Sequence, residues 1–484
     1  MHPAKVLMAL LSIMTLLFGV MVVFPADGVQ IGGIKFQFPT VEEFFNDIDP
    51  AEAESGKELA ELMEDTTTVL TTLDSLKIQQ KLDSLREAKK KLLFVDESSP
   101  SLYSFFKILE TAKFKKVRIM HFGDSQIESD RITGYIRNEF QKAFTGYGGG
   151  LFPIVQVAPK LFVNTTHSEN WKRYSGFGKK DTAVKHMKYG ALLNFSRYAP
   201  LKAVDSLQYE GWITIKKPRK SYGRTKKYHQ FKVYYGNVKG VVTYQVLLDG
   251  EVAKSDTLQA GALLDKIHVD MANTPEEIKV IFKGNDGPDI YGISLEGNAG
   301  VVVDNIPMRG SSGAVFKKQD RALLQAMFAE LAPSLIILEF GGNTVPYIDS
   351  QEECVNYGKW FASQIKMIKG MNPNATIILI GPSDMAIKVK TEYYTHPYLP
   401  HVRDVLKKAA QESNCMFWDM YEAMGGLNSI SKWIEAEPPL AAKDYTHFTP
   451  KGARKIAKMF YEQLMEKYDD YKHEETKSAD SNRI

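Results

Sequence analysis

From Val301 onward, short apolar runs alternate with amphipathic segments, and this alternation constrains the fold more than any other feature of the chain. Continuous apolar runs are typical of strands buried on both faces, and the helices between them cover a parallel sheet. The predicted strands are Leu335–Phe340, Thr376–Ile380 and Met416–Trp418, and the predicted helices are Lys317–Leu331 and Glu352–Lys369. Because such sheets bind ligands at the carboxyl ends of their strands, we expect the functional residues in the loops that follow them.

A serine lies in a loop of this kind. The sequence predicts a strand at 117–122, a turn that reads Gly-Asp-Ser-Gln, and a helix at 132–140. Such a turn exposes the Ser125 hydroxyl as a nucleophile, with its N–H at the positive end of the next helix. Taken alone, capping of the helix by Asp124 or Ser125 is the better explanation, because both residue types are common N-caps.

A base for this serine lies near the C-terminus. Asp444 and His447 belong to one short loop. An imidazole takes the proton of a serine hydroxyl best when a carboxylate fixes its tautomer. Taken alone, the pair is equally well explained by a helix-capping aspartate beside a surface histidine.

Two further loops offer groups that could stabilise an oxyanion. Asn343 follows the apolar strand at 335–340, and a side-chain amide there can donate a hydrogen bond to a developing negative charge. The loop after the run that begins at Val301 contains Gly310 and Gly313, whose N–H groups could face the same charge. The sequence leaves the choice between these two glycines open.

In chain order, these four segments resemble the conserved blocks of the SGNH, or GDSL-type, hydrolase family. The resemblance implies a flavodoxin-like α/β fold, with Ser125 as the nucleophile and Asp444 and His447 as the other members of a catalytic triad. It also implies an oxyanion hole formed by Ser125, Gly310 and Asn343, and a site that needs no metal or cofactor. Where the family often has leucine after Gly-Asp-Ser, this chain has glutamine, at position 126.

Between the serine block and the Gly310 block, the pattern changes to short alternating runs without a long helix. Asp249-Gly250 is a typical hairpin turn, and we predict an inserted antiparallel β-sandwich at 161–300. An insertion at this point resembles the bimodular SGNH esterases that remove O-acetyl groups from peptidoglycan, where it looks like a carbohydrate-binding module. Aromatic residues that could stack on sugars, although most are expected in the core, are Trp171, Trp212, Tyr234, Tyr235 and Tyr291.

The N-terminus predicts attachment to a membrane. Residues 6–24 carry no charge and are about long enough to span a bilayer. We expect residues 1–26 to form an uncleaved anchor, with the enzyme on the periplasmic side of a bacterial inner membrane, and keep cleavage of a secretory signal as the alternative. The full predicted organisation is an anchor at 1–26, a helical stalk at 27–100, hydrolase segments at 101–160 and 301–468 around the insertion, and a disordered tail at 469–484.

Composition excludes some partners. The net charge of +3 is small for 484 residues and no basic stripe is present, so nucleic acid is not an expected partner. No His or Cys cluster has the spacing of a metal site. Cys354 and Cys415 could form a disulfide, or Cys415 could be a small core residue. Ser383 and Asp384 are possible contacts at the rim of the site.

The predicted activity is removal of O-acetyl groups from a cell-envelope glycan, in particular peptidoglycan. The same residues would serve an O-acetyltransferase that passes the acetyl group to an envelope polysaccharide, since the outcome depends on whether water or a sugar hydroxyl attacks the acyl-enzyme. A non-catalytic glycan-binding protein with a degenerate hydrolase fold is the alternative from another class.

Overall fold

The computed structural model describes residues 29–31, 34–36, 100–219 and 221–481. The chain divides into two compact units, one up to Glu87 and one from Ala88 onward. In the first unit, β1 (Val29–Ile31) pairs antiparallel with β2 (Ile34–Phe36).

The predicted anchor at 1–26 and most of the predicted stalk at 27–100 lie outside the described residues. Within the segment predicted as stalk or linker, β1 and β2 are extended, and their β-branched residues Val29, Ile31 and Ile34 favour a strand. Among the residues that the structure describes, no helix combines the length and apolar composition needed to cross a membrane.

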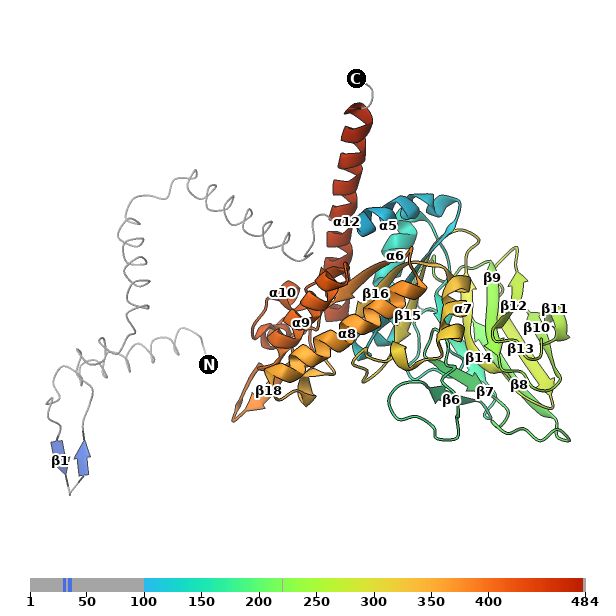
Figure 1. Ribbon diagram of the computed structural model, residues 1–484, viewed down its shortest axis with the longest axis horizontal. Helices are drawn as coiled ribbons and strands as arrows, with labels where there is room; N and C mark the ends of the chain where they lie inside the picture. The colour runs from blue at the N-terminus through green and yellow to red at the C-terminus, as the bar shows by residue number, and fades with distance from the viewer. Residues whose placement is uncertain (1–28, 32–33, 37–99, 220, 482–484) are drawn as a thin grey trace. The chain divides into compact units, whose positions relative to one another are not determined.

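The second unit is built on a five-stranded parallel sheet (Figure 1). The strands, in their order across the sheet, are β15 (Gly300–Pro307), β3 (Lys116–Gly123), β16 (Pro333–Glu339), β17 (Thr376–Ile380) and β20 (Met416–Trp418). Every neighbouring pair is parallel, so the carboxyl ends of all five strands meet at one edge. The predicted parallel α/β core is confirmed.

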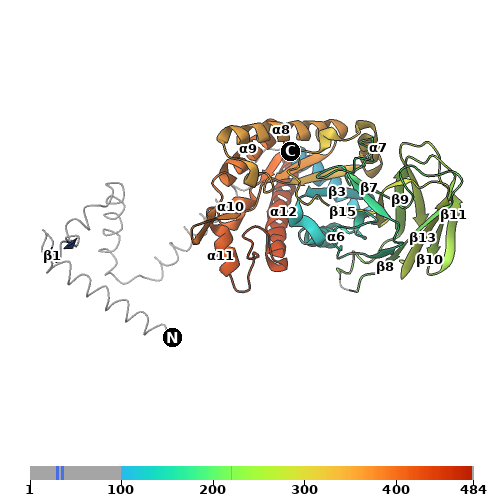
Figure 2. The ribbon, with the colours of Figure 1, turned by 90° about the horizontal axis from the view of Figure 1, so that it is seen from below.

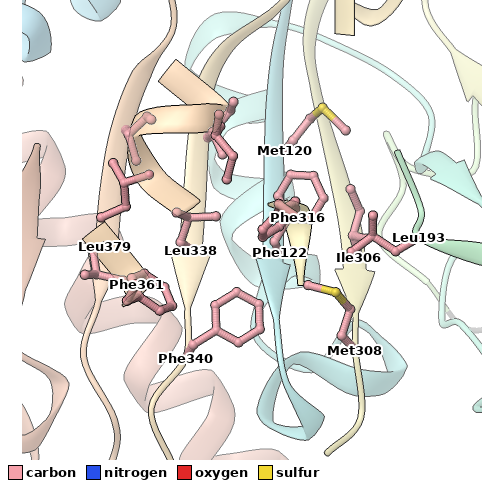
Figure 3. Close-up of a cluster of buried hydrophobic side chains, with 14 of the residues drawn as sticks. Met120, Phe122, Leu193, Ile306, Met308, Phe316, Leu338, Phe340, Phe361 and Leu379 are labelled. Carbon is pink, nitrogen blue, oxygen red and sulfur yellow. The ribbon is translucent and has the colours of Figure 1, made fainter. Parts of the chain in front are cut away.

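Helices cover both faces of this sheet (Figure 2). One face carries α5 (Pro100–Glu110), α6 (Thr133–Phe144) and α12 (Pro450–Ser481), and the other carries α7 (Arg321–Leu331), α8 (Gln351–Met371) and α9 (Leu399–Glu412). The side chains of β3 point to both faces of the sheet. Val117 and Ile119 belong to the apolar core beneath α5, α6 and α12, whereas Met120 and Phe122 belong to the core beneath α7, α8 and α9. Figure 3 shows Met120 and Phe122 within this latter core.

Two antiparallel sheets form the inserted β-domain. The first has the order β11-β10-β13-β8-β5 and the second β12-β9-β14-β7-β6, with β4 also paired to β14. Their bounds are β4 (Gly150–Phe152), β5 (Asn164–His167), β6 (Lys172–Ser175), β7 (Asn194–Arg197), β8 (Tyr209–Lys216), β9 (Gln230–Gly236), β10 (Val242–Leu248), β11 (Glu251–Thr257), β12 (Asp265–Asp270), β13 (Glu277–Gly284) and β14 (Asp289–Glu296). A shared apolar core joins the two sheets, as expected of a sandwich.

The inserted β-domain begins at β4, because that strand pairs with β14, although we expected the insertion to begin at residue 161. The predicted hairpin turn joins β10 to β11, where Asp249 and Gly250 both have positive φ angles, of 50° and 92°. The second sheet also packs on the α/β domain, since Tyr234 and Tyr291 share a core with Phe122.

The C-terminal segment is helical where we expected disorder. α12 extends to Ser481, so the prediction of a disordered tail is wrong for residues 469–481. Tyr471 is 5% exposed, and its ring centroid lies 5.3 Å from that of Tyr103 and 5.8 Å from that of Phe106 in α5. Charged composition predicts disorder because little apolar surface is available for burial. Here the buried ring of Tyr471, together with an ion pair of 2.7 Å between Lys472 and Glu110 of α5, connects the late turns of α12 to α5.

The remaining short elements connect these layers. They are η2 (Thr111–Lys113), η3 (Ser125–Asp130), η4 (Phe316–Lys318), η5 (Val345–Tyr347), β18 (Ala386–Val389), β19 (Glu392–Thr395), α10 (Met420–Met424) and α11 (Ser429–Glu435). η3, η5, β18 and α10 follow strands of the parallel sheet at its carboxyl edge, where the candidate site lies.

Candidate active site

Ser125 lies directly after β3 at the carboxyl edge of the sheet. The strand ends at Gly123, and Ser125 opens η3, a 3-10 helix. The Asp124 carboxylate accepts a hydrogen bond of 2.9 Å from the Gln126 N–H and closes the turn. Because helical geometry breaks within η3, α6 begins only at Thr133. Ser125 is thus the first residue of η3, which Asp124 caps, whereas the α-helix predicted at 132–140 begins only at Thr133 and does not start at the serine.

Ser125, His447 and Asp444 form a continuous series of hydrogen bonds. Ser125 Oγ lies 2.8 Å from His447 Nε2, and His447 Nδ1 lies 2.8 Å from Asp444 Oδ2. The other Asp444 oxygen accepts hydrogen bonds of 3.0 Å from the N–H groups of Thr446 and His447. Partial burial acts to raise the pKa of Asp444, but these hydrogen bonds hold it below its usual value. The ionised carboxylate therefore favours a proton on Nδ1, which leaves Nε2 free to accept the serine proton.

Gln126 holds the loop that carries His447. Its side-chain amide donates a 2.7 Å hydrogen bond to the Thr446 carbonyl, and its oxygen accepts a longer one, of 3.4 Å, from the Phe448 N–H. Arg131 adds a hydrogen bond of 3.3 Å to the Phe448 carbonyl. The backbone is thus fixed on both sides of the imidazole. This role was missed, because sequence alone does not show that a residue beside the serine meets a loop more than three hundred positions away.

The candidate oxyanion donors differ in their surroundings. Asn343 Nδ2 donates to Asp124 Oδ2 at 2.9 Å and makes a longer contact of 3.4 Å with the Ser311 carbonyl. Gly310 lines the same cavity as Ser125, with a φ angle of 75°. The Gly313 N–H instead donates to Ser311 Oγ at 3.1 Å, and a Cβ at this glycine would lie only 2.6 Å from an aromatic ring. The structure therefore favours Gly310 over Gly313 as the glycine at the site.

A cavity of about 570 Å³ opens at this point, which we call the serine cavity. Its lining includes Ser125, Gly310, Asn343 and His447. Ser383 also lines it, as expected. Asp384 does not: it is fully buried and accepts hydrogen bonds from Thr395 Oγ1 at 2.8 Å and from the Ile430 N–H at 2.9 Å. Its carboxylate is needed to satisfy buried donors, so the prediction of a rim contact is wrong for this residue.

Two buried carboxylates lie in the lining of the serine cavity. Burial raises the pKa of Asp124 to about 7, and the neighbouring Glu339 carboxylate acts in the same direction. Glu339 Oε2 lies 3.1 Å from His121 Nε2, while Glu339 Oε1 has no hydrogen-bond partner among the described residues. Sequence reasoning did not predict this pair, because Glu339 ends a strand that is otherwise mostly apolar.

Most of the aromatic residues considered for sugar stacking are core residues. Four of them are buried, namely Trp171, Tyr234, Tyr235 and Tyr291. Trp212 is partly buried, with the Lys279 ammonium 5.4 Å from its ring centroid. Tyr347, which sequence reasoning missed, is 85% exposed and belongs to the lining of the serine cavity. It is therefore the aromatic side chain best placed to meet a ligand there.

The described part of the chain holds no group of three or more His, Cys, Asp or Glu side chains suited to a metal ion. Cys354 and Cys415 are both buried free thiols, so the core interpretation of Cys415 holds. Burial raises the pKa of Cys415 to about 11, which makes it a poor nucleophile.

Residues 283–455 match the GDSL-like Lipase/Acylhydrolase family. The chain contains a GDSL-like acylhydrolase domain. The matched residues include Asn343, Asp444 and His447. Ser125 precedes them in the sequence and is separated from them by most of the inserted β-domain. The fold brings Ser125 into hydrogen-bond distance of His447 across this separation. No curated relative matches the sequence.

Several solved structures are similar to this chain, and three of them are described here. A peptidoglycan O-acetylesterase is 19% identical and covers 78% of this chain and 99% of its own, with a TM-score of 0.61, so the two chains share a fold. A salicylyl-acyltransferase from a tetracycline biosynthetic pathway is 13% identical and covers 63% and 97%, with a TM-score of 0.25. An acetyl xylan esterase is 15% identical and covers 34% and 80%, with a TM-score of 0.27. The last two similarities are too low to support an argument.

Proposed function

We propose that the protein is a serine esterase that removes O-acetyl groups from a cell-envelope glycan, specifically peptidoglycan. The observation that carries the proposal is the hydrogen-bonded series of Ser125, His447 and Asp444, of which Ser125 and His447 line the serine cavity. A hydroxyl, an imidazole and a carboxylate in this order form an activated nucleophile with its base.

The reaction begins when Ser125 Oγ attacks the ester carbonyl and His447 Nε2 takes its proton. The negative charge that develops on the carbonyl oxygen is stabilised by the backbone N–H groups of Ser125 and Gly310 and by the Asn343 amide. For Asn343 this requires that its 3.4 Å contact with the Ser311 carbonyl give way, while the 2.9 Å bond to Asp124 keeps the amide oriented.

The C–O bond to the sugar then breaks, and the imidazolium gives its proton to the leaving sugar hydroxyl. An acetyl group remains on Ser125. A water molecule, deprotonated by His447, attacks this acetyl-enzyme, and collapse of the second tetrahedral intermediate releases acetate and returns the proton to Ser125. Asp444 orients the imidazole and stabilises its positive charge in both halves of the reaction.

Hydrolysis is favoured over transfer to a second sugar by the exposure of the site. The side chains of His447 and Asp444 are 37% and 50% exposed, so water reaches the base directly. A transferase must order an acceptor and exclude water from the acyl-enzyme. No such shielding surrounds the imidazole among the described residues.

A glycan substrate is supported by Tyr347, whose exposed ring at the cavity offers a flat apolar face to a pyranose. The shared fold with a peptidoglycan O-acetylesterase supports peptidoglycan in particular. We further propose that the enzyme works in the bacterial envelope, on the periplasmic side of the inner membrane, since the N-terminal sequence has an uncharged apolar run long enough to span a bilayer.

The test is acetate release from O-acetylated peptidoglycan by the full-length protein and by Ser125→Ala, with and without an unacetylated glycan acceptor. The esterase proposal expects serine-dependent free acetate that the acceptor does not diminish. Acetyl groups on the acceptor would instead establish a transferase. Binding of the glycan without turnover of any ester would establish a non-catalytic glycan-binding protein.

A further inference from the structure

The loop 441–448, which we call the histidine loop, carries both Asp444 and His447 and contains an unusual backbone conformation. Tyr445, which lies between them, has a φ angle of 56°, in the left-handed region. This conformation is costly for a residue other than glycine, and it persists only where the surrounding structure holds it. The bend matters for the site, because it lets one Asp444 oxygen accept the N–H groups of Thr446 and His447 while the other meets the imidazole.

The β-hairpin of β18 and β19 holds Tyr445 in two ways. The ring of Tyr445 stacks face to face on that of Tyr393 in β19, with centroids 3.5 Å apart and ring planes within 5° of parallel. The Tyr445 carbonyl accepts a hydrogen bond of 3.0 Å from the N–H of Ala386, the first residue of β18. Neither tyrosine belongs to the lining of the serine cavity. The hairpin therefore supports the histidine loop from outside the site.

The hairpin is itself fixed at its base. The hydroxyl of Thr395, the last residue of β19, donates to the buried Asp384 carboxylate at 2.8 Å, and the Thr395 N–H donates to Asn428 Oδ1 at 2.9 Å. The His396 N–H donates to the Met385 carbonyl at 2.9 Å and closes the base. Figure 1 shows β18 at the margin of the α/β domain, on the side away from the inserted β-domain. The buried carboxylate thus anchors the support of the histidine loop.

The two neighbouring tyrosines of β19 lie on opposite faces of the hairpin, because side chains alternate along a strand. Tyr393 faces Tyr445, and the ammonium of its cross-strand partner Lys388 lies 5.9 Å from its ring centroid. Tyr394 is 44% exposed, and its hydroxyl donates to Glu392. One tyrosine therefore contacts the histidine loop, and the next one provides a matched residue that contacts the hairpin alone.

We propose that Tyr393 is a positioning residue, whose stack on Tyr445 holds the histidine loop in its active conformation. The proposal rests on the proposed esterase function. Without the ring of Tyr393, Tyr445 is free to leave the left-handed region, and the carboxylate and the imidazole of the loop then move relative to Ser125. A base displaced from the nucleophile slows proton transfer without weakening the binding of the substrate, so the loss falls on kcat and not on KM.

The test uses variants of the full-length protein and two measurements, namely steady-state hydrolysis of p-nitrophenyl acetate and the rate at which a phosphonate ester labels Ser125. Tyr393→Ala removes the stacked ring, and Tyr393→Phe keeps the ring and removes only the hydroxyl. Tyr394→Ala is the matched control on the other face of β19. Thermal unfolding shows whether each variant is folded. Tyr393→Leu, which keeps apolar bulk without the flat face, takes the place of Tyr393→Ala if that variant does not fold.

We expect Tyr393→Ala to lower kcat and the labelling rate by about tenfold with KM nearly unchanged. Tyr393→Phe and Tyr394→Ala should stay within about twofold of wild type, since both keep the stack. Full activity in Tyr393→Ala, an equal loss in Tyr394→Ala, a loss that Tyr393→Phe shares in full, or a rise in KM at unchanged kcat would overturn the proposal.

The two measurements also separate this proposal from the proposed function. Wild-type protein that is labelled at Ser125 but releases no acetate from O-acetylated peptidoglycan would overturn the proposed function and leave the positioning role to be decided by the labelling rates. Wild-type protein that is neither labelled nor active on p-nitrophenyl acetate would overturn both.

Discussion

At the scale of single residues, the polar contacts around Ser125 decide how the site is held. The candidate residues themselves could be predicted from their types and order, because Ser125, Asn343, Asp444 and His447 each lie in a short motif. Gln126 could not be predicted, since its role depends on a contact with a loop distant in sequence.

The first prediction concerns this positioning role. Gln126→Leu removes both hydrogen bonds to the loop that carries His447, and we expect kcat to fall by about tenfold to a hundredfold with little change in KM. Steady-state kinetics on an acetyl ester measures the two constants. Gln259→Leu, at an exposed position of the inserted β-domain, is the control. A rise in KM at unchanged kcat would show that Gln126 contacts the substrate instead.

The second prediction concerns Asp124, whose pKa burial raises to about 7. Between about pH 4 and pH 7 the folded protein holds a proton on this carboxyl that the unfolded chain has released, so folding stability falls as the pH rises. The asparagine of the Asp124→Asn variant does not titrate, so the variant does not lose stability in this way as the pH rises. We expect the free energy of unfolding of the variant, relative to wild type, to rise by about 3 kcal/mol from pH 4.5 to pH 8. Urea unfolding of both proteins at both pH values measures this difference. A difference that is the same at pH 4.5 and pH 8 would contradict the raised pKa of Asp124.

At the scale of elements, alternation and turn residues predicted the parallel strands and the β-sandwich, because each strand buries its own apolar run. The C-terminal segment was mispredicted for the opposite reason. Its many charged residues show no apolar periodicity. A few aromatic contacts with α5 nevertheless order the helix at least as far as Tyr471. Sparse tertiary contacts of this kind leave no periodic signal in a sequence.

The third prediction tests these contacts. Tyr471→Ala removes a buried ring between α12 and α5, and we expect the free energy of unfolding to fall by about 3 kcal/mol. Chemical denaturation measures the loss. His473→Ala, exposed on the same helix, is the control and should change stability by less than about 0.5 kcal/mol. Equal effects of the two substitutions would show that the late turns of α12 add nothing to the fold.

At the scale of the whole second unit, a buried ionic network joins the inserted β-domain to the parallel sheet. Glu296 of β14 is fully buried and pairs with Arg118 and Lys116 of β3 and with Lys232 of β9, the last two at 2.8 and 3.1 Å. Arg118 also binds Asp304 of β15 at 2.8 Å. The sequence shows each charge but not the partner that makes its burial possible, so this connection could not be predicted.

The fourth prediction concerns Glu296. Burial acts to raise its pKa, but the positive charge of Arg118 and of the two lysines holds the pKa well below the usual range. The stabilisation is therefore complete above the pKa of the unfolded chain and is lost as the pH falls. We expect Glu296→Gln to cost about 3–5 kcal/mol at neutral pH, and less below about pH 4.5. Thermal unfolding measures it.

The control for this substitution is Glu276→Gln, which breaks the ion pair of a glutamate that is 78% exposed and should cost less than about 1 kcal/mol. A cost for Glu296→Gln as small as that of the control would mean that the network does not link the two domains.

The central claim is that His447 activates Ser125 as the nucleophile, and covalent labelling tests it most directly. The full-length protein is incubated with a phosphonate ester, which reacts with activated serines, and the adduct is located by mass spectrometry of the digested protein. Ser383→Ala, a serine of the same cavity, is the matched control for Ser125→Ala. We predict one adduct, on Ser125, formed in Ser383→Ala and lost in Ser125→Ala and His447→Ala. An adduct on another residue, or labelling of Ser125 at an undiminished rate in His447→Ala, would contradict the account.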